Sequence, residues 1–295
     1  MKIAFLGLGA IGRPMAARIA AASLPLAVWN RTAERAEEFA RSTGARHAST
    51  AADAARDADV VITCFPESRH VQALLEGPEG LLAGLKRGSV LVDCTSGDPS
   101  TSRAIGHTLA SHGVDFLDAP VSGGVIGAEK GTLTVMVGGD AAVLDRVRPA
   151  LEPFAQKIVH CGDIGAGDTV KAVNQAFLAI HLLSAAEGLA TLVKEGVDPT
   201  KALEVINASS GRSNSSMNLI PERVLTRAFP RTFRLALLEK DIGIAAGLAR
   251  DNRVPAPITQ LTADVFRIAR GELGEFADHV EIVKMIEQWA DVEIA

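Results

Sequence analysis

The 295-residue sequence contains no tyrosine, and aromatic residues make up only 4% of it. A hydrophobic core must therefore be built mainly from aliphatic side chains. Basic residues are also outnumbered: 30 Lys and Arg stand against 35 Asp and Glu, the formal net charge is -5, and no basic run occurs along the chain. Proteins that bind nucleic acid or anionic membranes carry clusters of basic residues. We therefore expect neither kind of partner.

Cysteine is scarce as well. Cys64, Cys94 and Cys161 are far apart, and each lies at the edge of an apolar, strand-like segment. Such cysteines are typical of free thiols in a reducing compartment and not of a disulfide framework. The opening run Met1–Leu6 is too short for the apolar part of a signal peptide, and no stretch reaches the roughly 20 uninterrupted apolar residues of a membrane helix. We expect a cytoplasmic protein without a membrane segment.

Two kinds of active site are not indicated. The seven histidines are scattered, with no HExxH-type spacing and no cysteine pair beside them, so no metal site is predicted. The segment around Ser122 lacks the Gly-x-Ser-x-Gly pattern of a hydrolase nucleophile. The chemistry must therefore come from other residues.

The two halves of the chain differ in pattern. In the first half, short apolar segments alternate with helical patterns, which is typical of βαβ units and a parallel sheet. In the second half we predict one long Ala/Leu-rich helix over Gly167–Glu195, followed by helical patterns without strands. We therefore predict an α/β protein: a Rossmann-type, doubly wound, mostly parallel sheet in residues 1–162, then an all-α domain in 163–295 that begins with a long interdomain helix. The predicted strands are Ile3–Leu6, Leu26–Trp29, Val60–Cys64, Val90–Asp93, Asp115–Asp118 and Thr134–Val137.

A glycine-rich segment, Gly7-Leu8-Gly9-Ala10-Ile11-Gly12, follows the first predicted strand and precedes a helical pattern over residues 13–22. In this setting Gly7 permits a tight turn, Gly9 lets the backbone approach a pyrophosphate, and Gly12 allows close helix–strand packing. The helix N-terminus would face the phosphates. The alternative is a tight turn that binds nothing. The context favours a dinucleotide site and hence a dehydrogenase or reductase.

The segment Asn30-Arg31-Thr32 follows the second predicted strand, where an acidic residue normally binds the adenosine ribose. A carboxylate would repel the 2′-phosphate of NADP, whereas Asn30 is neutral and Arg31 can form charge-assisted bonds with that phosphate. The alternative is that Arg31 is a solvated surface residue. We expect NADP(H) to be preferred, with NAD(H) as a second option.

Four segments, Gly7–Ala16, Asp118–Gly124, Gly165–Gln175 and Lys240–Ile242, together resemble the β-hydroxyacid dehydrogenase family. This family includes 3-hydroxyisobutyrate dehydrogenase, tartronate semialdehyde reductase and the larger 6-phosphogluconate dehydrogenase. The resemblance covers essentially the whole chain. It implies hydride transfer between a nicotinamide cofactor and a small 3-hydroxy acid or semialdehyde.

Lys171 and Asn174 are three residues apart at the start of the long predicted helix and project from one face. Asp168 or Thr169 is expected to cap the first turn. A lysine in an apolar stretch either extends to solvent or is held inside for chemistry. The resemblance implies that Lys171 is the general acid/base, that Asn174 holds the substrate hydroxyl or carboxylate, and that Gln175 is a second polar neighbour.

Ser122-Gly123-Gly124 combines a hydroxyl with two glycines whose backbone N–H groups are unobstructed. This arrangement suits a substrate carboxylate, and the resemblance implies the same role; a plain turn is the alternative. Arg212, in a polar segment between helical patterns, could pair with a second acidic group of the substrate, although a surface or capping role is equally open. We therefore expect a small anionic hydroxy acid or semialdehyde and not a phosphorylated sugar.

Further cofactor contacts are expected at Phe65-Pro66 and Thr95-Ser96, which follow predicted strands and should lie at the carboxyl ends where ligands bind. Lys240, followed by Asp241, resembles the family's lysine that reaches the nicotinamide half of the cofactor; a surface ion pair is the alternative. The long helix is apolar on more than one face, so we expect a homodimer or homotetramer.

Other functions remain open at this point. The same residues would serve the reduction of glyoxylate or succinic semialdehyde. Imine reductases share the fold implied by the resemblance but usually lack the catalytic lysine, so Lys171 counts against them. A non-enzyme alternative is a catalytically idle cofactor-binding homologue.

Overall fold

The computed structural model describes residues 1–295. Contacts between residues divide the chain into two compact units, Met1–Lys171 and Ala172–Ala295. The division falls inside the long helix α9 (Ala166–Lys194), because the first turn of α9 packs against the first unit. A side chain at Gly167, for example, would collide with the backbone carbonyl of Met136.

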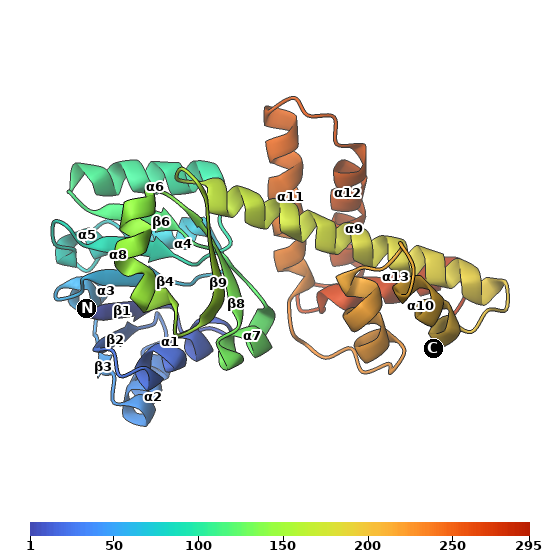
Figure 1. Ribbon diagram of the computed structural model, residues 1–295, viewed down its shortest axis with the longest axis horizontal. Coiled ribbons are helices and arrows are strands. Elements are labelled where there is room, and N and C mark those ends of the chain that lie inside the picture. Colours follow the sequence, from blue (N-terminus) through green and yellow to red (C-terminus); the bar gives the residue numbers. More distant parts are fainter. The chain divides into compact units, whose positions relative to one another are not determined.

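The first unit is built around a nine-stranded sheet with helices on both of its faces (Figure 1). The strand order is β3-β2-β1-β4-β5-β6-β8-β7, and β9 also pairs with β8. The pairs from β3 to β6 are parallel, β8 runs antiparallel to β6 and β7, and β9 is parallel to β8. The strands are β1 (Ile3–Leu6), β2 (Leu26–Trp29), β3 (Arg46–His47), β4 (Val60–Thr63), β5 (Val90–Asp93), β6 (Asp115–Asp118), β7 (Val121–Ser122), β8 (Leu133–Gly138) and β9 (Ala155–Gly162).

The direction of strand addition reverses at β1, since the chain passes from β1 to β2 on one side and later returns to β4 on the other. In a doubly wound sheet, such a reversal opens a crevice at the carboxyl ends of the strands, where ligands bind. The loops that follow β1, β4 and β5 therefore meet at one edge of the sheet.

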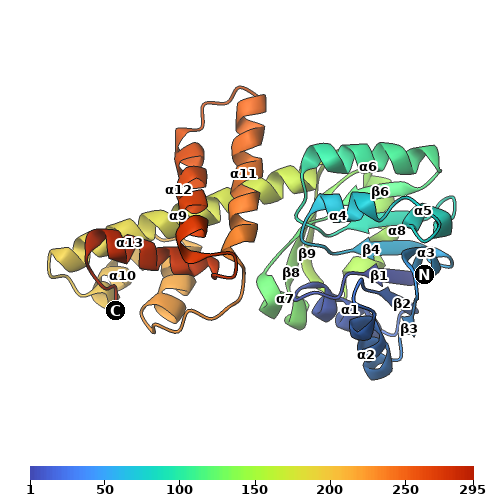
Figure 2. The same cartoon turned by 180° about the vertical axis from the view of Figure 1, so that it is seen from behind.

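The central strands are apolar along their whole length because both faces of the sheet are covered. In β1, Ile3 and Phe5 belong to a core shared with helices α1 and α8, whereas Ala4 and Leu6 belong to a second core shared with α3 and α6. Figure 2 shows the first unit from behind. The helices of this unit are α1 (Gly12–Ala21), α2 (Ala33–Thr43), α3 (Ala51–Ala55), α4 (Ser68–Ala73), α5 (Leu81–Gly84), α6 (Pro99–Ser111), α7 (Gly124–Lys130) and α8 (Ala141–Leu151).

All six predicted strands are present, with ends that shift by one residue at β4 and at each end of β8. Three strands, β3, β7 and β9, were not predicted from the sequence. Two of them have only two residues, and β9 carries Gln156, Lys157 and His160 with mostly exposed or half-buried side chains. An apolar run therefore could not reveal it.

The second unit is helical. It contains most of α9, followed by α10 (Pro199–Asn207), the π-helix η1 (Ser215–Val224), α11 (Leu235–Asp251), α12 (Pro257–Leu273), the short 3-10 helix η2 (His279–Glu281) and α13 (Ile282–Ala290). Helices α11 and α12 lie side by side as a hairpin (Figures 1 and 2). An aliphatic core joins α9 to the other helices of this unit. The predicted fold class, a mostly parallel sheet followed by an all-α region with a long helix, is confirmed.

Helix α9 is the one helix of the chain that is long and apolar enough to cross a membrane by length and composition alone, and 39% of its most apolar window is buried. A single helix of this kind is weak evidence of a membrane span, since the core helix of a soluble protein meets the same criterion. Its exposed side chains include Val173 and Phe177.

The turn between β1 and α1 gives a matched pair of stability predictions. A Cβ at Gly12 would collide with the carbonyl oxygen of Gly7, whereas a Cβ at Gly9 would meet no atom within 4 Å. We expect Gly12→Ala to lower the free energy of unfolding by about 1–3 kcal/mol, the usual cost of an extra carbon in a packed site. Gly9→Ala should leave it within about 0.5 kcal/mol. Urea denaturation followed by circular dichroism checks both; equal stability of the two variants would contradict the packing argument.

Candidate active site

In the glycine turn after β1, packing within the protein requires glycine at two of the three positions, Gly7 and Gly12, and not at the third, Gly9. Gly7 has a φ of +103°, and a side chain there would collide with the carbonyl of Cys64. Gly12 is closed off by Gly7, as described above. Gly9, in contrast, is exposed and has open space where its side chain would lie. Neither sterics nor backbone angle requires glycine at position 9, so the open space is available to a ligand that approaches the backbone closely.

The glycine turn leads directly into the N-terminus of α1. Its N-cap residue is Ile11, no side chain caps the helix, and the first turn carries no acidic residue. The first N–H groups of a helix have no partner within it and attract anions. The exposed Ala10 and the buried Leu8 complete the turn. These features fit the pyrophosphate of a dinucleotide.

Asn30, at the end of β2, has both ends of its amide engaged within the protein. Its Oδ1 accepts a hydrogen bond from the Leu8 N–H (2.9 Å), and its Nδ2 donates one to the carbonyl of Thr32 (3.0 Å). The residue therefore ties the glycine turn to the end of β2, a role that the sequence alone did not indicate. Arg31 and Thr32 are exposed, and the Arg31 guanidinium forms no ion pair with a carboxylate of the chain.

The loops after β4 and β5 are joined to each other. The hydroxyl oxygen of Thr95 accepts a hydrogen bond from the N–H of Phe65 (3.0 Å), while the Thr95 N–H donates to Asp93 Oδ1 (3.0 Å). Asp93 also accepts a hydrogen bond from the hydroxyl of Thr63 (2.8 Å). Burial raises the pKa of Asp93 to about 6 despite these bonds. Phe65, with the exposed Pro66, and Thr95, with the half-buried Ser96, are thus held together at the carboxyl edge of the sheet, as predicted from strand order.

Ser122-Gly123-Gly124 lies where β7 passes into α7. Both glycines have positive φ, +135° and +65°, and both are exposed. Successive residues in such conformations point backbone N–H groups outward. Gly124 also has open space where its side chain would be. The segment thus presents backbone donors beside the Ser122 hydroxyl, as an anion site requires.

Lys171 is only 7% exposed, although lysine is seldom buried without a partner or a task. It lies in the second turn of α9, at the end of the first unit. Asp118, at the end of β6, and Asp168, in the first turn of α9, are each 1% exposed. The first turn of α9 is therefore surrounded by buried acidic side chains.

The capping of α9 differs from the prediction that Asp168 or Thr169 would cap it. The cap is Asp118, whose Oδ1 and Oδ2 accept hydrogen bonds from the backbone N–H groups of Gly165 (2.7 Å) and Asp168 (2.9 Å). Asp168 points its carboxyl group elsewhere, and the hydroxyl of Thr169 bonds back to the carbonyl of Gly165. A cap supplied from 47 residues away leaves no local pattern in the sequence.

In the second unit, Gln175 and Lys240 meet at one buried acid. The Gln175 amide donates a hydrogen bond to Asp241 Oδ2 (3.0 Å), and Lys240 pairs with Asp241 Oδ1 (2.9 Å). Asn174 donates a hydrogen bond to Gln175 Oε1 (3.3 Å). Gln175 and Asp241 are 4% and 3% exposed. The structure thus links Asn174, Gln175 and Lys240 into one network through Asp241, which the sequence analysis had treated only as the neighbour of Lys240.

Arg212 lies between α10 and the π-helix η1, where it is exposed and forms no ion pair within the chain. Two buried side-chain oxygens nearby in the sequence, Asn207 Oδ1 and Ser215 Oγ, have no hydrogen-bond partner. Long π-helices are rare and often accompany functional sites. The segment therefore combines an exposed cation with an irregular helix and two buried side-chain oxygens that lack a partner.

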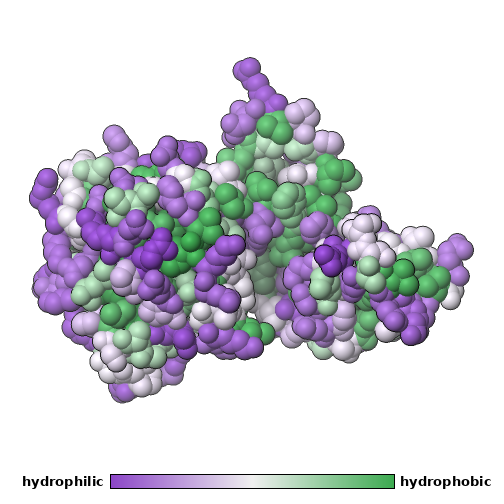
Figure 3. All heavy atoms as spheres, in the orientation of Figure 1, coloured by the Kyte–Doolittle hydropathy of each residue, from purple (hydrophilic) through white to green (hydrophobic).

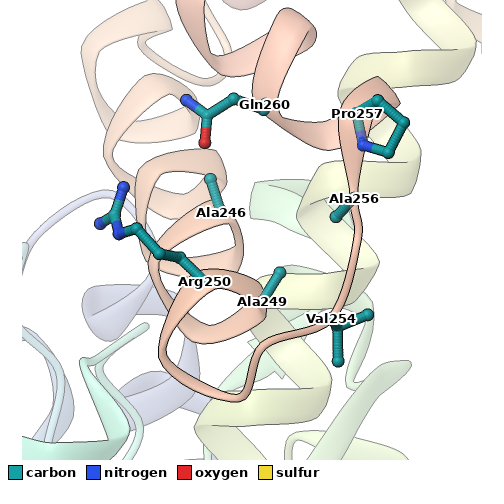
Figure 4. A pocket seen from close by; sticks show the side chains of 7 residues that line it. All are labelled: Ala246, Ala249, Arg250, Val254, Ala256, Pro257 and Gln260. Carbon is teal, nitrogen blue, oxygen red and sulfur yellow. The ribbon is translucent and has the colours of Figure 1, made fainter.

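A pocket also lies at the loop end of the α11–α12 hairpin, lined by Ala246, Ala249, Arg250, Val254, Ala256, Pro257 and Gln260 (Figure 4). Arg250 is its only ionisable lining residue, and none of the predicted site residues contributes to it. Hydrophobic atoms gather over this hairpin in the surface view (Figure 3). We assign no chemistry to the pocket. No group of three or more His, Cys, Asp or Glu side chains in the chain could hold a metal ion.

Two family models together cover most of the chain. The NAD binding domain of 6-phosphogluconate dehydrogenase matches residues 2–162, and the NAD-binding domain of NADP-dependent 3-hydroxyisobutyrate dehydrogenase matches residues 165–286. The two matches meet near Gly162, at the end of β9.

Individual relatives match over nearly the whole length. The chain is 34% identical to 2-(hydroxymethyl)glutarate dehydrogenase of Eubacterium barkeri, over 100% of this chain and 98% of the relative. It is 37% identical to 3-hydroxyisobutyrate dehydrogenase of Pseudomonas aeruginosa, over 90% and 91%. A solved structure of 3-hydroxyisobutyrate dehydrogenase from Mycobacterium tuberculosis with L-serine superimposes with a TM-score of 0.89, at 31% identity, over 97% and 98% of the two chains.

The reversal of strand order at β1, the open glycine turn and the buried lysine at the start of α9 agree with these matches. The chain belongs to the β-hydroxyacid dehydrogenase family, whose members use a nicotinamide cofactor.

Proposed function

We propose that this protein interconverts a small 3-hydroxy acid and the corresponding semialdehyde, with NADP(H) as cofactor and Lys171 as general acid/base. The burial of Lys171 at the start of α9 carries the proposal, because a lysine held 7% exposed beside the carboxyl edge of a dinucleotide-binding sheet is positioned for chemistry and not for solvation. The family's hydroxy-acid dehydrogenases support the same reaction.

The bound nicotinamide would accept the hydride from the alcohol carbon or return it to the carbonyl. Lys171 Nζ, in its neutral form, would take the proton of the hydroxyl as the hydride leaves; in reduction its ammonium form would give that proton to the carbonyl oxygen. Ser122, Gly123 and Gly124 would bind the substrate carboxylate through the hydroxyl and backbone N–H groups.

Asn174 lies one turn after Lys171 on the same helix and would orient the substrate hydroxyl or carboxylate. Its hydrogen bond to Gln175, which is itself held by Asp241, restrains the amide. We propose that Lys240 contacts the nicotinamide half of the cofactor, because Lys240-Asp241 resembles the Lys-Asp pair of the family. The ion pair with Asp241 would hold the Lys240 side chain in place.

Turnover by Lys171→Ala tests the central assignment. With a panel of 3-hydroxy acids and semialdehydes, we expect kcat to fall by about 10²–10⁴-fold, the usual contribution of a general acid/base. The Kd for NADPH should stay within about threefold, because the lysine is not needed to bind the phosphates. The exposed Lys130, in α7, provides the control variant Lys130→Ala, which should keep full turnover. Undiminished turnover by Lys171→Ala would refute the mechanism.

The preference for NADP(H) is proposed on the surroundings of Arg31. This guanidinium is exposed at the end of β2 and free of carboxylate partners, so it is available to a 2′-phosphate. Because Asn30 is occupied with Leu8 and Thr32, Arg31 carries this preference, with the exposed Thr32 as a further contact.

Arg31→Ala should therefore separate the two cofactors. A lost charge-assisted bond is worth about 1.5–3 kcal/mol, so we expect the Kd for NADPH to rise roughly 10–100-fold while the Kd for NADH changes little. Fluorescence titration with each cofactor measures both. Arg41→Ala, also exposed but at the far end of α2, is the matched control and should bind like the unaltered protein. Equal losses for NADPH and NADH would argue against recognition of the 2′-phosphate.

For the substrate, we propose an anion with a second acidic group that pairs with Arg212. The name of the Eubacterium barkeri relative, 2-(hydroxymethyl)glutarate dehydrogenase, describes a hydroxy acid with two carboxylates. Arg212 lacks an internal partner, which leaves its guanidinium available. Reduction of glyoxylate or succinic semialdehyde by the same residues is the second candidate, and a catalytically idle cofactor-binding protein is a third.

Arg212→Ala distinguishes these substrate classes. We expect KM for a dicarboxylate hydroxy acid to rise about tenfold or more, with kcat nearly unchanged, because the contact would serve the ground state and the transition state alike. KM for a monocarboxylate such as 3-hydroxyisobutyrate should not change. Lys201→Ala, at an exposed position of α10, provides the control. A KM unaffected for every substrate would remove Arg212 from the site.

Three further proposals concern the whole chain. We assign residues 1–162 to cofactor binding and 163–295 to substrate binding and self-association. Exposed apolar side chains on α9 (Val173, Phe177) and on α12 (Ile258, Leu261) support a homodimer or homotetramer. The three free cysteines suit a reducing compartment such as the cytoplasm.

A further inference from the structure

The first turn of α9 is fixed to the sheet by a carboxylate on each side. From one side, Asp118 at the end of β6 accepts hydrogen bonds from the N–H groups of Gly165 and Asp168. From the other, Asp168 reaches toward the segment between β5 and α6. Its Oδ1 accepts a hydrogen bond from the N–H of Gly97 (2.9 Å), and its Oδ2 accepts one from the hydroxyl of Ser102 (2.6 Å).

Space for these carboxylates is made by glycines on three different segments. A Cβ at Gly138, in β8, would collide with Asp118 Oδ1, and one at Gly167 would lie 2.9 Å from Asp118 Oδ2. A Cβ at Gly97 would lie 3.0 Å from Asp168 Oδ2. The two acids therefore occupy space that a side chain at any of these three glycines would enter.

The burial of two neighbouring acids lowers the stability of the fold, so stability does not account for this arrangement. Burial and the nearby charge of Asp118 raise the pKa of Asp168 to about 8, and burial raises the pKa of Asp118 as well. Two buried acids that oppose each other's ionisation cost free energy that an apolar pair of similar size would not. A single side-chain oxygen from Asp, Ser, Thr or Asn just before the helix would have capped it locally.

Lys171 follows Asp168 by three residues, so the pinned turn and the lysine share one stretch of helix. We infer that Asp118 and Asp168 are positioning residues that hold Lys171 at a fixed place relative to the loop Thr95–Gly97, in which the cofactor contact Thr95 lies. The inference rests on the proposed role of Lys171 as general acid/base. A misplacement of about 1 Å in such a group can cost about 100-fold in rate.

The chemistry of the hydrogen bonds makes the two aspartates respond differently to the same substitution. Asn at position 168 keeps an oxygen for the Gly97 N–H and can donate its NH2 group to the Ser102 hydroxyl. Asn at position 118 has only one oxygen for two N–H donors, so its NH2 group would face a donor. Asp168→Asn should therefore keep the activity that Asp168→Ala loses. Asp118→Asn should lose activity, because Asn cannot replace the aspartate at that position.

The test measures kcat, KM and the Kd for NADPH in Asp168→Ala, Asp168→Asn and Asp118→Asn. We expect kcat to fall at least tenfold in Asp168→Ala and Asp118→Asn, and to stay within about threefold in Asp168→Asn. KM and the Kd for NADPH should stay within about threefold in all three, because the glycine turn and the substrate anion site are untouched. If Asp168→Asn loses as much activity as Asp168→Ala, the carboxyl group has a direct chemical role and the positioning role is wrong.

A double substitution separates positioning of Lys171 from a general effect on the fold. In the Lys171→Ala background, Asp168→Ala should reduce the residual turnover less than twofold, because there is no longer a lysine to position. Multiplicative losses would overturn the inference. If Asp168→Ala does not fold, Ser102→Ala, which removes one partner of Asp168, takes its place and should show a smaller loss of kcat with the same non-additivity.

Failure of this inference can be told apart from failure of the proposed function. Full turnover by Lys171→Ala would remove the proposed general acid/base, whatever the aspartate variants do. Loss of turnover in Lys171→Ala together with unchanged kcat in Asp168→Ala and Asp118→Asn would leave the proposed function standing and remove only the positioning role.

Discussion

The carboxylate of Asp118 joins the parallel sheet to the long helix, and the arrangement of the candidate site depends on that junction. The side chain comes from the end of β6, and its two oxygens take the N–H groups that the start of α9 would otherwise leave unpaired. Helix α9 is 29 residues long, and Lys171 lies in its second turn, directly after the turn that Asp118 holds. Lys171 then follows a turn that is held by the sheet and not a flexible loop, which suits the role of general acid/base proposed for it.

Polar side chains at the carboxyl edge of the sheet are paired mainly with backbone groups of neighbouring loops. Asn30 binds the glycine turn, Thr95 binds the loop after β4, and Asp168 binds the loop after β5. Each bond joins segments that are 22 to 71 residues apart. Hydrogen bonds of this kind therefore join loops that are distant in the sequence at the carboxyl edge of the sheet.

The sequence predicted those features that a local pattern encodes. Six strands are apolar runs, the long helix contains few helix-breaking residues, and the glycines of the turn have the Gly-x-Gly-x-x-Gly spacing. Each of these features could therefore be located from the sequence. The prediction failed for β9, whose mixed side chains at the sheet edge leave no periodic signal, and for the cap of α9, whose acceptor lies 47 residues away. Pairing of Gln175 with Asp241, 66 residues apart, was likewise invisible. Long-range polar pairs depend on how elements pack, which periodicity does not describe.

The residues of the candidate site are divided between the two units of the chain. The glycine turn, the loops after β4 and β5 and the turn that carries Lys171 all belong to the first unit, whose core and hydrogen bonds fix them together. Arg212 instead lies on an exposed segment between α10 and a π-helix, where two buried oxygens lack partners. Substitutions in such a segment disturb few packed contacts and cost little stability, whereas changes at the sheet edge break several bonds at once. If Lys171 and Arg212 have the roles proposed for them, substitutions around Arg212 would change substrate selection at a smaller cost in stability than substitutions around Lys171.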